Sequence, residues 1–255
     1  MKEETEVEIL DGMPAVVLRE EDAICIADLH LGYEEALASS GISLPSRQLS
    51  DVELNFERAF NMCGGASLLV INGDLKHVFE RVSRQEWKEV PMFIDFALSF
   101  VKKIILVRGN HDTHLGPLRR FREVDVVSTI EMGNVLLIHG HNRNFRSIFS
   151  SNAEEVLIAH EHPVLVLGDR VGARVRMSCF LRGECMGKRL WVMPAFSPLA
   201  GGTAVNFAAK SDFLSPVLRS EIVNTDEMEV YAVDSSVGTL AFPPMGVWKK
   251  ISLFL

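Results

Sequence analysis

Short apolar runs, each followed within a few residues by Asp, Asn or His, recur through the first half of the chain. None of them alternates apolar with polar residues, a pattern typical of strands buried on both faces of a sheet. We therefore expect four strands with polar side chains just beyond their ends: residues 23–27 before Asp28, 67–71 before Asn72-Gly73-Asp74, 103–107 before Arg108-Gly109-Asn110-His111-Asp112, and 135–138 before His139.

Two segments between these runs carry apolar residues at helical spacing. The first covers residues 49–60, and Gly64 supplies a stop signal after it. The second starts at a capping box in which Ser83 is answered by Glu86, and its apolar face includes Trp87 as a core residue. This alternation of strands and helices predicts parallel strands with helices packed outside the sheet.

The pattern changes after about residue 163, where strand-like runs follow one another without long helices between them. These runs cover residues 164–167, 175–181, 190–192, 230–233 and 239–242. We expect them to form a second, partly antiparallel sheet, with residues 153–159 weakly helical and residues 198–215 a loop. With no linker, repeat or low-complexity segment, the prediction is one α/β domain over residues 1–255, built from two layered mixed β-sheets flanked by helices.

Composition and charge restrict the classes of protein. The 26 basic and 34 acidic residues give a net charge of −8, which argues against holding nucleic acid mainly by bulk positive charge. No apolar run reaches the roughly 18 residues of a membrane span, and the acidic start, Met1 to Glu6, does not resemble a signal peptide. Four cysteines without paired metal-binding spacing predict buried, reduced thiols in a cytoplasmic protein: Cys25, Cys63, Cys179 and Cys185.

The histidines are distributed unevenly. All eight lie in or beside five clusters, four at the predicted strand ends and a fifth at residues 160–162, and none follows residue 162. Imidazole and carboxylate are ligands that suit manganese, iron and zinc, so this distribution indicates metal chemistry. The eight are His30, His77, His111, His114, His139, His141, His160 and His162.

In their order along the chain, these clusters resemble the motifs of the calcineurin-like metallophosphoesterase superfamily. The series is Asp28-x-His30, Gly73-Asp74, Gly109-Asn110-His111-Asp112, His139 and His160-x-His162, over residues 23–162. A narrower likeness, to DNA-ligase-associated and related archaeal phosphoesterases, rests on Asp28-Leu29-His30-Leu31-Gly32, residues 108–112, Cys179-Phe180, Pro194-Ala195-Phe196 and Gly201-Gly202.

The resemblance implies a four-layer sandwich and a centre of two divalent metal ions, with manganese expected and iron, zinc or nickel as alternatives. By this likeness Asp28, His30 and His162 hold one ion, Asn110, His139 and His160 hold the other, and Asp74 bridges both. A hydroxide that bridges the ions would attack the phosphorus of a phosphate ester. His111 would protonate the leaving oxygen, and Asp112 would act beside it by orienting the loop or a histidine.

Two positions depart from the common pattern of the superfamily. Ala159 replaces the glycine that usually precedes the last His-x-His pair, and His77 replaces an aspartate that pairs with the catalytic histidine in many relatives. His77, Arg108 and His141 are candidates for contact with the substrate. For each of the three, a solvated loop residue or ordinary surface charge is the alternative interpretation.

The function predicted from the sequence is hydrolysis of a phosphodiester in a nucleotide or a nucleic acid. A phosphomonoesterase of the same mechanism, a non-catalytic metal-binding scaffold and a DNA nuclease remain as alternatives. The expected partner is a phosphate-ester substrate. Neither association with a membrane nor stable binding to DNA is expected. The sequence leaves the oligomeric state open, a dimer included.

Overall fold

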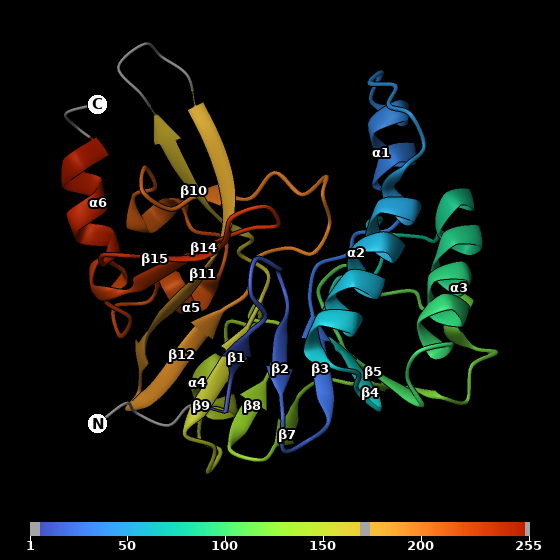
Figure 1. The fold of residues 1–255 in the computed structure, drawn as a ribbon, viewed down its shortest axis with the longest axis horizontal. Helices are drawn as coiled ribbons and strands as arrows, with labels where there is room; N and C mark the ends of the chain where they lie inside the picture. The colour runs from blue at the N-terminus through green and yellow to red at the C-terminus, as the bar shows by residue number, and fades with distance from the viewer. Residues whose placement is uncertain (1–5, 169–173, 253–255) are drawn as a thin grey trace.

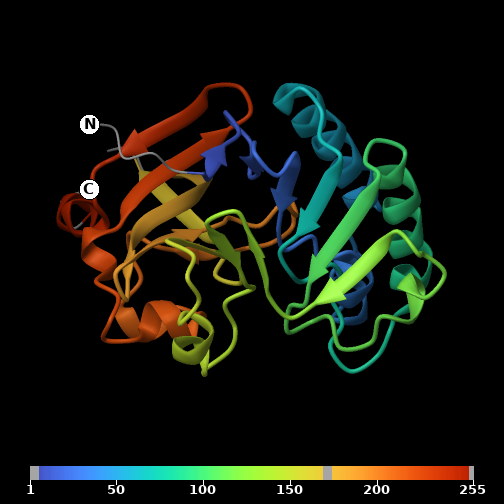
Figure 2. The same cartoon turned by 90° about the horizontal axis from the view of Figure 1, so that it is seen from below.

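Two β-sheets pack face to face in the computed structural model, which describes residues 6–168 and 174–252. Helices α1 to α3 cover the outer face of the first sheet, and α5 and α6 lie on the side of the second (Figure 1). The view from below separates the same two halves, each made of a sheet with helices outside it (Figure 2). The predicted α/β sandwich of two mixed sheets flanked by helices is confirmed. The expectation of one domain over residues 1–255 stays a prediction.

The first sheet has six strands in the order β1 to β6. The pairs β1–β2 and β2–β3 are antiparallel, and β3 to β6 run parallel, as the strand-helix alternation predicts. The strands are β1 (Glu8–Ile9), β2 (Val16–Leu18), β3 (Ala23–Ile26), β4 (Leu68–Ile71), β5 (Lys103–Val107) and β6 (Val124–Val127).

Three helices accompany this sheet: α1 (Tyr33–Ser39), α2 (Gln48–Cys63) and α3 (Arg84–Leu98). Helix α2 ends at Gly64, whose φ of 83° is a left-handed conformation that glycine adopts without strain. The predicted capping box at the start of α3 is present between Ser83 and Glu86. The prediction that Trp87 is a core residue is wrong: it lies in the first turn of α3 and is 55% exposed, and only part of its ring is covered, by Gly116 of a short connecting segment.

The second sheet has a main path in the order β13-β10-β11-β12-β9-β8-β7, with β14 paired to β11 and β15 to β14. Its strands are β7 (Ile130–Met132), β8 (Val135–Leu137), β9 (Glu155–Ile158), β10 (Pro163–Gly168), β11 (Arg174–Cys185), β12 (Lys188–Val192), β13 (Thr203–Ala204), β14 (Glu229–Asp234) and β15 (Gly238–Phe242). The other helices are α4 (Phe145–Ile148), α5 (Pro216–Arg219) and α6 (Met245–Ser252), and the 3₁₀ turns are η1 (Gly116–Leu118), η2 (Lys210–Asp212) and η3 (Thr225–Glu227).

The structure corrects two expectations about this half. The second sheet begins at β7, near residue 130, and not near residue 163. Residues 155–158, expected to be weakly helical, form strand β9, because they pair in parallel with β8 on one side and β12 on the other. The expected loop at residues 198–215 is largely irregular, with β13 and η2 inside it.

Successive residues of β3 point into two different cores. Ile24 and Ile26 pack with Phe56 of α2 and Phe93 of α3, whereas Ala23 and Cys25 face the second sheet. A strand that is apolar on both sides explains why its sequence does not alternate. A third core lies on the other face of the second sheet.

Within the described residues, no helix is both long and apolar enough to cross a membrane. All four cysteines are free thiols and buried, as predicted. The expectation that the chain does not start with a signal peptide falls largely on residues 1–5, outside the described residues.

Candidate metal centre

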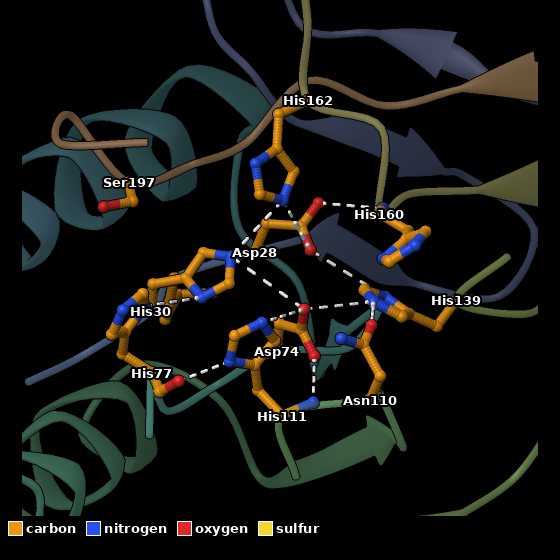
Figure 3. Close-up of polar contacts among 12 residues, drawn as sticks. Asp28, His30, Asp74, His77, Asn110, His111, His139, His160, His162 and Ser197 are labelled. Atoms are coloured by element: carbon orange, nitrogen blue, oxygen red, sulfur yellow. Dashed lines mark hydrogen bonds and ion pairs between the residues drawn. The ribbon is translucent and has the colours of Figure 1, made fainter. Parts of the chain in front are cut away.

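The ends of five strands meet at one place between the two sheets. Strands β3, β4 and β5 of the first sheet and β8 and β9 of the second deliver the polar residues that follow them. The expectation that the first four clusters share one parallel sheet is therefore corrected: β8, which precedes His139, belongs to the second sheet. Figure 3 shows the side chains of Asp28, His30, Asp74, His139 and His162 pointing toward a common centre.

The first group of ligand-type side chains consists of Asp28, His30 and His162. Their ligand atoms all lie within 4.8 Å of one another. His162 Nε2 lies 3.3 Å from Asp28 Oδ1 and 3.3 Å from His30 Nε2. These are the three residues expected to hold one ion.

The second group contains Asp74, His139 and His160, whose ligand atoms also lie within 4.8 Å of one another. His139 Nε2 lies 3.2 Å from Asp74 Oδ2 and 3.2 Å from Asn110 Oδ1. The Nδ1–H of His139 donates to the carbonyl of Asn72 at 2.9 Å, which leaves Nε2 directed at the carboxylate.

Asp74 lies between the two groups. Its Oδ2 atom is 3.2 Å from His139 Nε2 in one group and 3.9 Å from His30 Nε2 in the other. The side chain is 1% exposed, so water does not screen its charge. The structure thus brings all seven predicted ligands together, and their role as ligands remains a proposal.

The donor set fits divalent cations. Asp28 Oδ1 is buried and accepts no hydrogen bond from the described residues, although His162 Nε2 is 3.3 Å away. Leaving a buried carboxylate oxygen without a partner costs about 1–3 kcal/mol or more. A cation bound by Asp28 and His162 would satisfy both atoms.

Five of the seven candidate ligands have a left-handed backbone conformation. The φ angles of Asp28, His30, Asp74, His160 and His162 lie between 47° and 71°. Such conformations cost about 1–3 kcal/mol each in non-glycine residues and are concentrated at functional sites. The fold therefore holds these side chains in place against local backbone preference.

Two glycines permit the close approach of the strand ends. A Cβ atom at Gly73, whose φ is 92°, would lie 2.0 Å from His139 Nδ1. A Cβ atom at Gly109 would lie 2.1 Å from Asp74 Oδ1. A side chain at either position would displace a candidate ligand.

The two aspartates and the histidines shift one another's pKa. Burial opposes a charge on His139, but Asp74 and Asp28 outweigh it and raise the pKa of His139 to about 10. Burial is likewise outweighed at His162, whose pKa is raised by Asp28. At His30 burial dominates and lowers the pKa to about 3. The two carboxylates therefore demand positive charge at this place, which a divalent cation would supply.

His111 stands at the edge of the centre. Its backbone N–H donates to Asp74 Oδ1 at 2.8 Å, and its Nδ1 donates to the carbonyl of His77. The other ring nitrogen, Nε2, lies 3.8 Å from Asp74 Oδ2 and faces the site. Burial lowers the pKa of His111, and Asp74 partly offsets this.

Asp112 is fully buried, and its carboxylate accepts hydrogen bonds from the backbone. Its Oδ2 accepts the N–H groups of Asp74 at 2.8 Å and Gly109 at 2.9 Å, and its Oδ1 accepts that of Leu75 at 3.1 Å. The carboxylate thus joins the two loops that carry Asp74 and Asn110. These contacts favour a positioning role for Asp112 over contact with the substrate.

The three candidates for substrate contact are placed differently. His77 Nδ1 lies 3.4 Å from His30 Nδ1, next to the first group of ligands. The ring of His141 lies 5.3 Å from that of His139, and its buried Nδ1 has no hydrogen-bond partner among the described residues. Arg108 is exposed, and its side chain makes no hydrogen bond or ion pair with another described residue.

Sequence reasoning missed two supporting side chains. The Nε2 of Gln48, at the start of α2, donates to the carbonyls of Leu29 at 3.2 Å and His30 at 2.8 Å and to Ser197 Oγ at 3.1 Å. Glu161, between two candidate ligands, accepts bonds from Thr203 Oγ1 and from the N–H groups of Leu214 and Ser215. No local pattern marks Gln48, whereas the position of Glu161 between His160 and His162 was a usable signal.

Comparison with solved structures finds similar folds. A nuclease named MPE from Pseudomonas putida is 21% identical, with a TM-score of 0.58, 90% of this chain and 92% of that chain covered. A phosphoesterase from E. coli, Yfce, is 16% identical, with a TM-score of 0.40 and coverage of 85% and 90%. Among curated proteins no significant match was found.

The sequence of the chain also matches the model of a protein family. The model of the calcineurin-like phosphoesterase family matches residues 23–182, more than half of the 255 residues. The matched region contains every strand end that contributes to the centre. The chain therefore belongs to the calcineurin-like phosphoesterase family and is a metal-dependent hydrolase.

Proposed function

We propose that the chain is a dinuclear phosphodiesterase that acts on nucleotide or nucleic-acid phosphodiesters. The observation that carries this proposal is the position of Asp74, whose Oδ2 lies within 3.9 Å of a histidine nitrogen in each ligand group. In this proposal Asp28, His30 and His162 hold one cation, Asn110, His139 and His160 hold the other, and Asp74 contacts both. Manganese is the proposed ion, with iron, zinc and nickel as alternatives that the same ligand types accept.

When bound, two such cations would stabilise the charge on a phosphate ester and lower the pKa of water. His111 would contribute the proton that the leaving oxygen needs. Its Nδ1 is engaged by the carbonyl of His77, so Nε2 is the nitrogen available to the substrate. The negative phosphate would favour the protonated form of His111, against the burial that lowers its pKa in the free protein.

Two further observations bear on the choice of substrate. The net charge of −8 suits a substrate held at one phosphate better than along a nucleic-acid duplex. The structural neighbour from Pseudomonas putida is named a nuclease, which makes a nucleic-acid backbone a substrate to test. We also propose that the chain is related to the DNA-ligase-associated and archaeal phosphoesterases. We further propose that the protein resides in the cytosol, because buried free thiols fit a reducing compartment.

The first test is a metal-titrated comparison of bis-aryl and mono-aryl phosphate, with manganese, iron, zinc and nickel each added to metal-free protein. We expect faster hydrolysis of the diester, with manganese giving the highest rate. Preference for the monoester would replace this proposal by a phosphomonoesterase. No hydrolysis with any ion would favour the non-catalytic scaffold.

The variant His111→Ala tests the catalytic assignment. It should retain two ions per chain and lose at least about 100-fold in rate, the lower end of a general acid's contribution. His114→Ala is the matched control, because His114 is an exposed histidine in the same loop. Equal loss in both variants, or no loss in either, would remove His111 from the proposal.

A further inference from the structure

Four side-chain rings lie in a row along one edge of the candidate centre. The ring of Tyr33 lies 4.1 Å from that of His77 at an angle of 31°. The rings of His77 and His111 are stacked at 5.4 Å, and Phe79 lies on His111 with a centroid distance of 3.7 Å. The row thus ends in Phe79, directly beside the proposed proton donor.

Phe79 is open to solvent although it is large and apolar. It is 45% exposed, and none of the three described hydrophobic cores includes it. A single exposed aromatic residue is common on protein surfaces and indicates little alone. Here, however, the ring contacts His111, so its exposed surface lies next to the proposed proton donor.

The backbone around Phe79 is held firmly. Glu86 Oε1 accepts the N–H groups of His77 at 2.9 Å and Val78 at 2.6 Å. The ammonium group of Lys76, a residue only 1% exposed, donates to the carbonyls of Val78 and Arg81. The Phe79 carbonyl itself accepts the hydroxyl of Thr113. Phe79 is therefore pre-positioned, which limits the ordering entropy that binding against it would cost.

We propose that Phe79 is a stacking platform for an aromatic ring on the leaving group of the substrate. His111 contacts the leaving oxygen in the proposed reaction, so the group that carries this oxygen lies on the same side as Phe79. Aromatic side chains bind unpaired bases through their faces, with little dependence on which base is present. The site would then prefer phosphodiesters of nucleosides in single strands, or aryl esters, to esters without a ring.

This inference rests on the proposed function, and its test separates the two. The substrates are the dinucleotide TpT and two analogues in which one base or the other is replaced by hydrogen. With the wild-type protein and manganese, loss of the base on the leaving side should lower kcat/KM about tenfold, within the range expected for base stacking on an aromatic residue. In Phe79→Ala the same loss should change kcat/KM less than about twofold.

The readout is the ratio of kcat/KM for TpT to kcat/KM for the analogue that lacks the base on the leaving side. Any effect of Phe79 on His111 changes both values equally and cancels in this ratio. Phe79→Trp should keep or increase the ratio. Leu54→Ala is the control, since Leu54 is an exposed apolar residue on α2 outside the site, and it should keep the wild-type ratio. Melting curves check that each variant folds.

Two outcomes would overturn different statements. If the wild-type protein cleaves no phosphodiester with any of the four ions, the proposed function fails. If it cleaves TpT and Phe79→Ala keeps the tenfold ratio, the stacking platform is wrong and the proposed function stands.

Discussion

His30 and His162 are 132 positions apart in the sequence, yet their Nε2 atoms lie 3.3 Å apart. Burial lowers the pKa of His30 to about 3, so this imidazole is neutral near pH 7. Two ring nitrogens at this distance attract each other only if a proton or a cation lies between them. Asp28, 3.3 Å from His162 Nε2, adds negative charge at the same place. A bound cation would join the two nitrogens and also offset the charge of Asp28.

Divalent cations should therefore stabilise the folded state. At a free manganese concentration of about 100 times the dissociation constant, binding adds about 2.7 kcal/mol to the free energy of unfolding. For a chain of this size, this corresponds to a rise in Tm of about 5–10 °C. Calorimetry with and without chelator measures the shift.

The variant Asp74→Asn should reduce this shift, because Asp74 is the carboxylate that lies between both groups. Asp51→Asn, an exposed residue on α2, is the matched control and should keep the full shift. A Tm that does not respond to any divalent ion would contradict the assignment of these residues as ligands.

Asp112 should matter for stability more than for chemistry. In Asp112→Ala three backbone N–H groups lose their acceptor, and each buried unpaired donor costs about 1–3 kcal/mol. We expect the free energy of unfolding to fall by about 3 kcal/mol or more, measured by urea denaturation. Asp112→Asn retains one oxygen and should lose less. If Asp112→Ala unfolded at the wild-type urea concentration and lost activity, Asp112 would have a direct catalytic role instead.

Glu161 should determine how tightly the cations are held. Its carboxylate fixes residues 203–215 against the turn that carries His160 and His162. Groups that orient metal ligands typically contribute about 10–100-fold to metal affinity, so Glu161→Ala should weaken manganese binding by about tenfold or more. Titration calorimetry measures this affinity.

Thr203→Val is the matched variant, because it removes only one of the three donors to the Glu161 carboxylate. It should weaken manganese binding less than Glu161→Ala does. A lowered Tm in Glu161→Ala with unchanged manganese affinity would show that Glu161 supports the fold alone.

The helices and the strand ends could be predicted because their signals are local. Gly64 ends α2 through its own backbone conformation, and Ser83 and Glu86 begin α3 through bonds three residues apart. The clusters of His and Asp after apolar runs were equally visible, although the sequence did not show that they come from two facing sheets. These features needed no knowledge of the tertiary structure.

The features that sequence reasoning missed depend on distant contacts. Residues 153–159 contain good helix formers, but pairing with β8 and β12 makes residues 155–158 a strand. Gln48 has its partners at Leu29 and His30, 19 and 18 positions away, so nothing near it in the sequence marks its role. The contact of Trp87 with Gly116 of η1 is likewise distant in the sequence, so nothing near Trp87 marks how far it is covered.

Glu34, on α1, should make stability depend on pH. It is 7% exposed and accepts the N–H groups of Arg47 at 2.7 Å and Gln48 at 2.9 Å, and Gln85 Nε2 at 2.8 Å. Burial raises the pKa of Glu34, but the hydrogen bonds from Arg47 and Gln48 outweigh it, so the pKa in the folded state is lowered. The carboxylate thus stabilises the fold above the unfolded-state pKa of about 4.3, and this contribution is lost as the pH falls through the folded-state pKa.

Glu34→Gln should lower the free energy of unfolding by about 1–2 kcal/mol at pH 7, because hydrogen bonds to a charged acceptor are the stronger ones. The difference from the wild-type protein should shrink below about pH 4.3, since the wild-type side chain then also becomes neutral. Urea denaturation at several pH values measures it, with Glu57→Gln, an exposed residue on α2, as the control for lost charge. A difference that stays constant from pH 7 to pH 3 would mean that the shape of the side chain at position 34, and not its ionisation, holds α1 to the start of α2.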